Sequence, residues 1–156
     1  MNGTLKDITR AAEGRYLMEA EKATIRAYAT GMADRLETMR RVEERESQIV
    51  GRTVDALKET QSEPLSDPTV EAKVRRDVSL TIRYIAQAHV REDPAFFRVH
   101  FAEWFGELLC AMSPPKAIAD TVAALRAAMD ETLDGSDSRH LLPYVDLFLE
   151  EVHRWT

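Results

Sequence analysis

The sequence predicts an all-α protein that folds as one domain over residues 1–156. Its 44% hydrophobic and 31% charged content fits a globular domain that is long enough to bury one sizeable core. The long runs between breaks consist of helix-forming residues such as Ala, Glu, Arg, Leu and Met. Only 6 Gly and 6 Pro interrupt the chain, so turn signals are too rare for an all-β meander.

The first thirty residues predict an N-terminal helical hairpin. A short helix over residues 4–13 places Leu5 and Ile8 on one side, but it carries little apolar area and would not be stable alone. A second helix over residues 19–30 carries a stripe of alanines, and Gly31 offers a break or bend after it. We therefore expect this hairpin to need a partner surface.

The middle of the chain predicts two longer helices separated by a loop. The first spans about residues 32–60, and its dense polar run at 40–48 is either a solvated face or a helix–helix corner. Two prolines and two serines make 61–68 the clearest loop in the chain. Asp67 and Pro68 then start a helix as N-cap and first helical residue, and apolar residues recur along it every three or four positions.

Three further helices complete the pattern. Asp93 and Pro94 repeat the start signal, and the aromatic stripe over residues 97–105 indicates core packing more than a ligand-stacking wall. The next helix opens after a Pro-Pro pair, Gly135 suits its C-cap, and the last helix begins near Ser138. Seven or eight helices of unequal length, without a heptad register, favour a globin-like packing over a four-helix bundle.

The charge and cysteine content exclude several classes of protein. Lys+Arg 21 against Asp+Glu 27 gives a net charge of -6, and the basic residues are scattered, so no nucleic-acid partner is expected. No stretch approaches the roughly 20 apolar residues of a membrane helix, so no membrane insertion is expected. The single Cys110 excludes an intramolecular disulfide and a thiolate metal site, and the N-terminal residues lack the layout of a signal peptide. We expect a cytoplasmic protein.

Motifs of catalysis and metal binding are missing from the sequence. It has no Gly-rich phosphate loop and no serine elbow, so we expect no enzyme. Glu150-x-x-His153 is half of a di-iron pattern whose second half is absent, which favours a solvated face and no metal site. His89 and His100 lie on apolar stripes where a haem ligand of a globin-like fold would lie, although pairing of the imidazole with a carbonyl is the favoured interpretation.

The most suggestive polar cluster is Arg75-Arg76-Asp77, in the helix that starts at Pro68. An Arg beside an Asp is able to bind an acidic group on one side and a ligand N–H on the other. By spacing alone, a surface ion pair is the favoured interpretation.

Three segments together carry a family resemblance. They are ITRAAEGRYL at 8–17, VRRDVSLTIRYI at 74–85 and PYVDLFLEEV at 143–152. Their order and spacing resemble those of the phycobiliproteins, the α and β subunits of phycobilisome light-harvesting antennae, in particular the allophycocyanin type. The resemblance covers nearly the whole chain and implies the globin-like fold of the phycobiliprotein type, with the N-terminal helical hairpin as its extension.

The resemblance also implies a pigment site. The family attaches an open-chain tetrapyrrole, a bilin, through a thioether to a cysteine three residues before an Asp; Asp77 matches that Asp, and Val74 stands in place of the cysteine. Because valine has no nucleophile, covalent attachment there is excluded. Arg76 matches the family's propionate-binding Arg, and Asp77 matches the carboxylate that accepts hydrogen bonds from central pyrrole nitrogens. Leu109 replaces a family tyrosine near the pocket, which predicts a reduced pocket.

Two hypotheses for the function follow from this resemblance. In the first, the protein binds a bilin non-covalently through Arg76 and Asp77 in a light-related role. In the second, it is a chromophore-free interaction or sensor module, and packing closes the space around Val74, Arg76 and Asp77.

The last implication concerns assembly. In the family the first two helices pack on a partner subunit, and an Asp of the first helix pairs with a partner Arg at the position of Arg83. That Arg is present here, whereas Ala11 stands at the position of the Asp. We expect a homodimer or heterodimer through the N-terminal helices, with Ile8, Tyr16, Leu17 and Arg83 at its interface.

Overall fold

The computed structural model describes residues 3–60 and 65–154, and all regular structure in these ranges is helical. The elements are α1 (Gly3–Ala11), α2 (Glu19–Thr60), α4 (Pro68–Arg91), α5 (Pro94–Phe97), the π-helical segment η1 (Arg98–Ala102), α6 (Glu103–Met112), α7 (Pro115–Thr132) and α8 (Gly135–His153). The prediction of an all-α fold is confirmed. None of the described helices is both long enough and apolar enough to cross a membrane.

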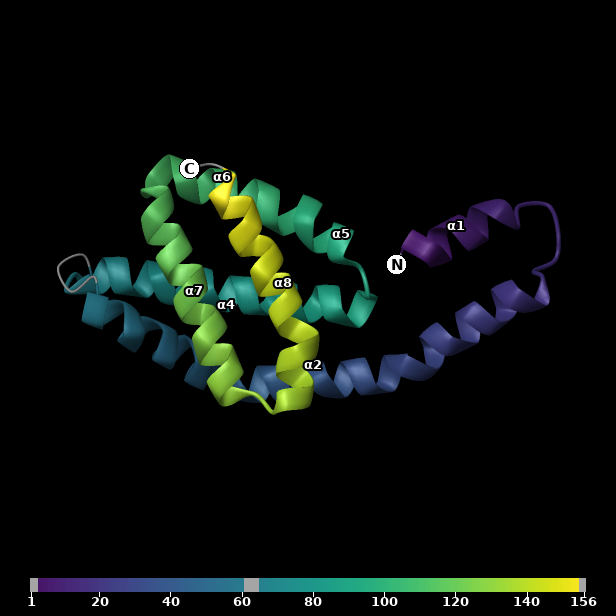
Figure 1. Cartoon of the computed structure of the whole chain (residues 1–156), viewed down its shortest axis with the longest axis horizontal. Helices are drawn as coiled ribbons and strands as arrows, with labels where there is room; N and C mark the ends of the chain where they lie inside the picture. Colours follow the sequence, from purple (N-terminus) through teal and green to yellow (C-terminus); the bar gives the residue numbers. More distant parts are fainter. Residues whose placement is uncertain (1–2, 61–64, 155–156) are drawn as a thin grey trace.

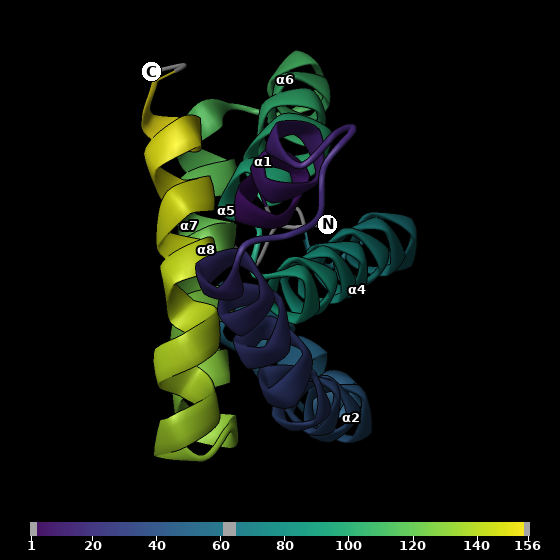
Figure 2. The same cartoon turned by 90° about the vertical axis from the view of Figure 1, so that its right-hand side faces the viewer.

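The body of the molecule consists of crossed helices. α2 packs against α4 and α7, and α7 packs against α8, so that α7 and α8 cross the direction of α2 and α4 (Figures 1 and 2). α5, η1 and α6 follow one another along a further side of the body (Figure 1). The beginning of α2 extends out of this body, and the chain reverses direction between α1 and α2 (Figure 1). This packing of unequal helices is globin-like, as the sequence predicts.

Aromatic residues form the centre of the core. Phe97, Phe101 and Phe105 recur every four residues and are 0%, 0% and 4% exposed. The ring centroid of Phe101 lies 4.8 Å from that of Phe105, 4.7 Å from that of Tyr84 and 5.4 Å from that of Phe148. Rings at these separations contribute more than their buried area alone. The interpretation of this stripe as core is confirmed for Phe97 and Phe101, while Phe105 is buried and also lines a pocket.

The two predicted helix starts at Asp-Pro pairs are confirmed. The Asp67 carboxylate accepts a hydrogen bond from the backbone N–H of Thr69 at 2.7 Å, and that of Asp93 accepts one from the N–H of Phe96 at 3.0 Å. Each aspartate thus satisfies one of the N–H groups that a helix leaves unpaired in its first turn, and the proline after it has no N–H to satisfy.

Helix α8 begins earlier than predicted, and the assignment of Gly135 as a C-cap is wrong. α7 ends where Leu133 takes an extended conformation, and Gly135 is already the first residue of α8. The first turn is fixed by a long-range contact, because the buried carboxylate of Asp137 accepts hydrogen bonds from Arg41 at 2.6 and 2.7 Å. This ion pair joins the first turn of α8 to α2.

Helix α2 runs unbroken for 42 residues, so of the break or bend expected at Gly31 the break does not occur. The second helix of the predicted hairpin is therefore the beginning of α2. The polar run at 40–48 is also part of this helix; most of its residues are exposed, while Val42 is buried. The run is a solvated face and not a helix–helix corner.

Gly31 leaves space for the side chain of Arg35. A Cβ atom at this position would lie 2.6 Å from Nη1 of Arg35. The Arg35 guanidinium folds back over the glycine and donates hydrogen bonds to the carbonyl oxygens of Tyr28 at 2.8 Å and Val90 at 3.1 Å, and to the carboxylate of Glu92 at 2.7 Å. Arg35 is 6% exposed, and its hydrogen bonds connect the N-terminal part of α2, which extends from the body, to the end of α4.

Candidate functional site: an apolar pocket beside α4

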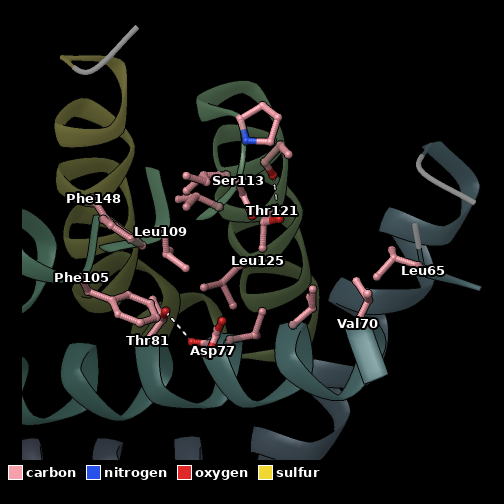
Figure 3. Close-up of a pocket in the computed structure, with 16 residues that line it drawn as sticks. Leu65, Val70, Asp77, Thr81, Phe105, Leu109, Ser113, Thr121, Leu125 and Phe148 are labelled. Carbon is pink, nitrogen blue, oxygen red and sulfur yellow. Dashed lines mark hydrogen bonds between the residues drawn. The ribbon is translucent and has the colours of Figure 1, made fainter. Parts of the chain in front are cut away.

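A pocket of about 320 Å³ lies between α4, α6 and α7, with Leu65 and Phe148 completing its walls (Figure 3). Most of the side chains that line it are apolar. They include Val70, Val74 and Val78 of α4, Phe105 and Leu109 of α6, and Ile118, Val122 and Leu125 of α7. The volume is at the lower end of the range of about 300–1,000 Å³ that small-molecule sites cover.

Asp77 is the one charged residue among the described residues that line this pocket. Its place follows from helix register, because Val70, Val74, Asp77 and Thr81 recur every three or four residues and therefore lie on one face of α4. Figure 3 shows this face of α4 at the base of the pocket. The pocket thus combines an apolar enclosure with a single carboxylate.

Arg76 lies outside the pocket although it precedes Asp77 in the chain. Consecutive residues of an α-helix point about 100° apart, and Arg76 falls on the solvent side of the turn while Asp77 and Val78 line the pocket. Nε and Nη2 of Arg76 both donate to Oδ1 of Asp77, at 2.9 and 2.8 Å, and the Arg76 side chain is 70% exposed. Within the described part of the chain, no residue donates to Oδ2 of Asp77. Arg76 therefore holds one oxygen of the carboxylate and leaves the other available.

Two threonine hydroxyl groups also line the pocket, in addition to the hydroxyl of Ser113. Thr81 Oγ1 donates to the carbonyl oxygen of Asp77, and Thr121 Oγ1 donates to that of Ala117, both at 2.8 Å. Because each hydroxyl proton is bound within its own helix, the threonine oxygens present only lone pairs to the pocket. Sequence reasoning missed both residues. The i+4 spacing from Asp77 would have found Thr81, but no local signal points to Thr121.

Neither histidine weighed as a haem ligand lines the pocket. His89 is 9% exposed and its ring centroid lies 5.6 Å from that of His140. Burial, followed by the nearby His140 and Arg35, lowers the pKa of His89 to about 4. His100 is exposed, with its ring 5.0 Å from that of Phe96. Among the described residues, no three His, Cys, Asp or Glu side chains gather in a group that could hold a metal ion.

The pattern of segments noted in the sequence has a counterpart in a known family. A family model described as phycobilisome protein matches residues 8–152 of the chain. The chain belongs to the phycobilisome protein family. The resemblance inferred from the sequence is confirmed by this match. No curated protein matches the chain.

Within this family, Val74 is the informative residue of the pocket wall. The expected attachment cysteine corresponds to Val74, which stands three residues before Asp77 and lines the same pocket. A valine offers no nucleophile to a pigment. Leu109, at the position expected for a tyrosine, and Leu65 add further apolar side chains to the walls.

Four residues are expected at a dimer interface from the resemblance to the phycobiliproteins, and most of them are accessible on this chain. Tyr16 is 96% exposed, and Ile8 and Leu17 are half-buried. Arg83 binds Glu46 of its own chain, through Nε at 3.1 Å and Nη2 at 2.8 Å. The role of Arg83 at a dimer interface stays a prediction.

Proposed function

We propose that this member of the phycobilisome protein family binds an open-chain tetrapyrrole non-covalently in the pocket beside α4, in a light-related, non-enzymatic and cytoplasmic role. The observation that carries the proposal is the pocket itself, which is lined by the carboxylate of Asp77 and by Val74. A chromophore-free module was expected to have this space closed by packing, with no cavity large enough for a tetrapyrrole. The space is open, and its volume of about 320 Å³ would enclose a tetrapyrrole in part, which favours the pigment-binding hypothesis.

The donor and acceptor properties of the pocket fit such a ligand. Oδ2 of Asp77 accepts no hydrogen bond from the described residues and is a strong acceptor for pyrrole N–H groups, particularly when the tetrapyrrole is protonated. Apolar side chains of α4, α6 and α7 line the same pocket and would pack against the flat faces of pyrrole rings. When bound, a bilin supplies absorption of visible light. Val74 leaves the association non-covalent.

Titration of the purified protein with biliverdin tests this proposal. We expect a saturable change in the absorption spectrum at micromolar ligand, and release of all pigment on denaturation because no thioether forms. Asp77→Asn should weaken binding at least tenfold, whereas Asp130→Asn, an exposed change on α7 outside the pocket, should leave it unaltered. An unchanged spectrum, or an Asp77→Asn protein that binds like the parent, would refute the proposal.

We infer that the chain associates through α1 and the beginning of α2, as a homodimer or with a related subunit. α1 has no buried residue, and a helix of 9 residues is too short to be stable in water without tertiary packing. Large apolar side chains are exposed next to it, with Tyr16 at 96% and Met18 at 59%. Coverage of these side chains by a partner would supply the packing that α1 lacks.

Light scattering coupled to size exclusion measures this association. Ile8→Asp places a charge on the apolar side of α1 and should shift the mass toward the monomer, while Lys6→Asp, on another side of the same helix, should not. A dimer that survives Ile8→Asp unchanged would refute the role of α1. If the protein is a dimer but binds no bilin, the chromophore-free interaction module becomes the better hypothesis.

A further inference from the structure

We propose that Arg35 and Glu92 form a clamp that fixes the direction of an N-terminal arm, so that the arm meets a second subunit in one geometry. The arm consists of residues 3–34, which comprise α1, the turn after it and the beginning of α2. This inference rests on the proposed association through α1 and the beginning of α2, and it names the residues that position them.

Burial alone does not hold the arm against the body. None of its residues is buried, and the first buried residue along α2 is Arg35. Figure 1 shows the beginning of α2 extending beyond the crossed helices. Residues 19–34 are about 24 Å long, so a rotation of about 10° at their base moves the far end by about 4 Å. The direction of the arm therefore depends on the contacts of Arg35 at this base.

Arg35 braces α2 across a weak point of the helix. Its guanidinium passes over Gly31, donates to the carbonyl oxygen of Tyr28 at 2.8 Å and has its Cζ 4.6 Å from the centroid of the Tyr28 ring. A glycine weakens a helix, because its backbone loses more conformational freedom on folding than that of other residues. The hydrogen bond and the cation over the ring span this position and stiffen the arm next to the body.

The same guanidinium joins the arm to the end of α4. Nε donates to the carbonyl oxygen of Val90 at 3.1 Å, and Nη1 donates to the Glu92 carboxylate at 2.7 Å. The side chains of Arg35 and Glu92 are 8% and 46% exposed, so the arginine end of this charged pair is shielded from water. One side chain thus binds the arm and the body at once.

The backbone of Glu92 indicates a role for its carboxylate. Glu92 is the C-cap of α4 with φ 47° and ψ 46°, in the left-handed region that favours glycine. Among the described residues, it is the one residue other than glycine with a positive φ. Such a conformation persists where surrounding contacts hold it, and the pair with Arg35 is a contact that a glycine would not make.

A second arginine–glutamate pair fixes the turn at the far end of the arm. Arg15 donates to both carboxylate oxygens of Glu21, at 2.9 and 2.6 Å, and Glu21 also accepts the backbone N–H of Met18 at 2.7 Å. The bonds from Arg15 and then Met18 lower the pKa of Glu21 to about 2, so the carboxylate stays charged. An arm fixed at both ends loses little conformational freedom on association, which favours binding.

Spin labels measure the direction of the arm. Labels at Ala20→Cys in the arm and Asp130→Cys on α7, in a Cys110→Ser background, give the distance between arm and body. Ile8→Asp is included to keep distances between subunits out of the measurement. We expect one narrow distance distribution when the clamp is intact.

Two clamp variants and two matched controls are compared. Arg35→Gln and Glu92→Lys should broaden the distance distribution at least twofold. In the unlabelled chain without Ile8→Asp, they should raise the dissociation constant of the dimer at least tenfold, as followed by light scattering on dilution. Glu92→Lys changes an exposed residue, so its effect does not depend on a buried substitution. Arg40→Gln, which loses pairs with two glutamates of its own helix, and Glu150→Lys on α8 should leave both quantities unchanged.

The outcomes separate the clamp from the proposed association. A narrow distribution in both clamp variants, or an unchanged dissociation constant in spite of a broad distribution, would overturn the clamp and leave association through α1 standing. A dimer that resists Ile8→Asp but is weakened by both clamp variants would sustain the clamp and refute the role of α1. A parent chain that stays monomeric would refute both.

Discussion

The buried imidazole of His89 predicts that acid destabilises the protein over a defined pH window. His89 lies near the end of α4, is 9% exposed and stacks on His140. Its pKa is lowered from 6.5 to about 4, first by burial, then by His140 and Arg35; Asp137 acts in the opposite direction but more weakly. The folded protein therefore holds this imidazole neutral at a pH where an unfolded chain would protonate it.

The sign and size of the effect follow from proton linkage. Because the folded-state pKa is below the unfolded one, the unfolded state binds more protons between pH 6.5 and 4, so stability falls as the pH falls through this window. The part of the free energy of unfolding that depends on a neutral His89 is present in full above pH 6.5. It amounts to about 3 kcal/mol, at about 1.4 kcal/mol for each unit of difference between the folded and unfolded pKa. About 2 kcal/mol of it is lost at pH 5.

Urea unfolding at pH 7 and pH 5 measures this loss. The free energy of unfolding should fall by about 2 kcal/mol more in the parent protein than in His89→Gln, which carries no titrating group at this position. Protonation of Asp137, whose pKa is lowered chiefly by its hydrogen bond to Arg41, contributes in both proteins and cancels in the comparison. His100→Gln, at an exposed position, should behave like the parent. Equal pH dependence in the parent and His89→Gln would contradict this account of the buried imidazole.

Three further changes test the packing around α2 by urea unfolding at pH 7. Gly51→Ala should raise the free energy of unfolding by about 0.5–1 kcal/mol, because the added Cβ meets no atom within 4 Å and alanine favours the helix. Gly31→Ala should instead lower the free energy of unfolding by about 1–2 kcal/mol, because its Cβ displaces the Arg35 guanidinium from its hydrogen bonds. Equal stabilisation by the two alanines would contradict a contact between Arg35 and position 31. Asp137→Ala should cost about 2–3 kcal/mol by leaving Arg41 unpaired, and a loss below about 0.5 kcal/mol would show that this ion pair does not anchor α8.

Features that depend on neighbouring residues in the chain were predictable from the sequence. Asp67 and Asp93 start helices as expected, because an N-cap aspartate bonds to an amide only two or three residues away. The face of α4 that carries Val74 and Asp77 also follows from the spacing of its apolar residues. The same spacing would have separated Arg76 from Asp77, since Arg76 lies two residues after Val74 and falls outside the three- and four-residue steps that link Val74, Asp77 and Thr81.

Features that depend on distant contacts were not predictable in this way. A glycine at position 31 has the same local signal whether it ends a helix or leaves space inside one, and the Arg35 side chain that fills this space is held by a hydrogen bond to Val90 across 55 residues of sequence. The first turn of α8 depends on Arg41 in the same manner. Thr121 reaches the pocket only through the packing of α7 against the other helices, which the sequence pattern of α7 does not contain.

Val74 has a consequence for how any pigment would be kept. A thioether fixes one chromophore to one chain for the life of the protein, whereas a ligand held beside a valine is exchangeable. Its occupancy would follow the free pigment concentration relative to Kd, and its residence time would be set by the dissociation rate. Binding of pigment to the folded state alone would also raise the stability of the protein as pigment accumulates. The fraction of chains that carry pigment would therefore rise and fall with the free pigment in the cell.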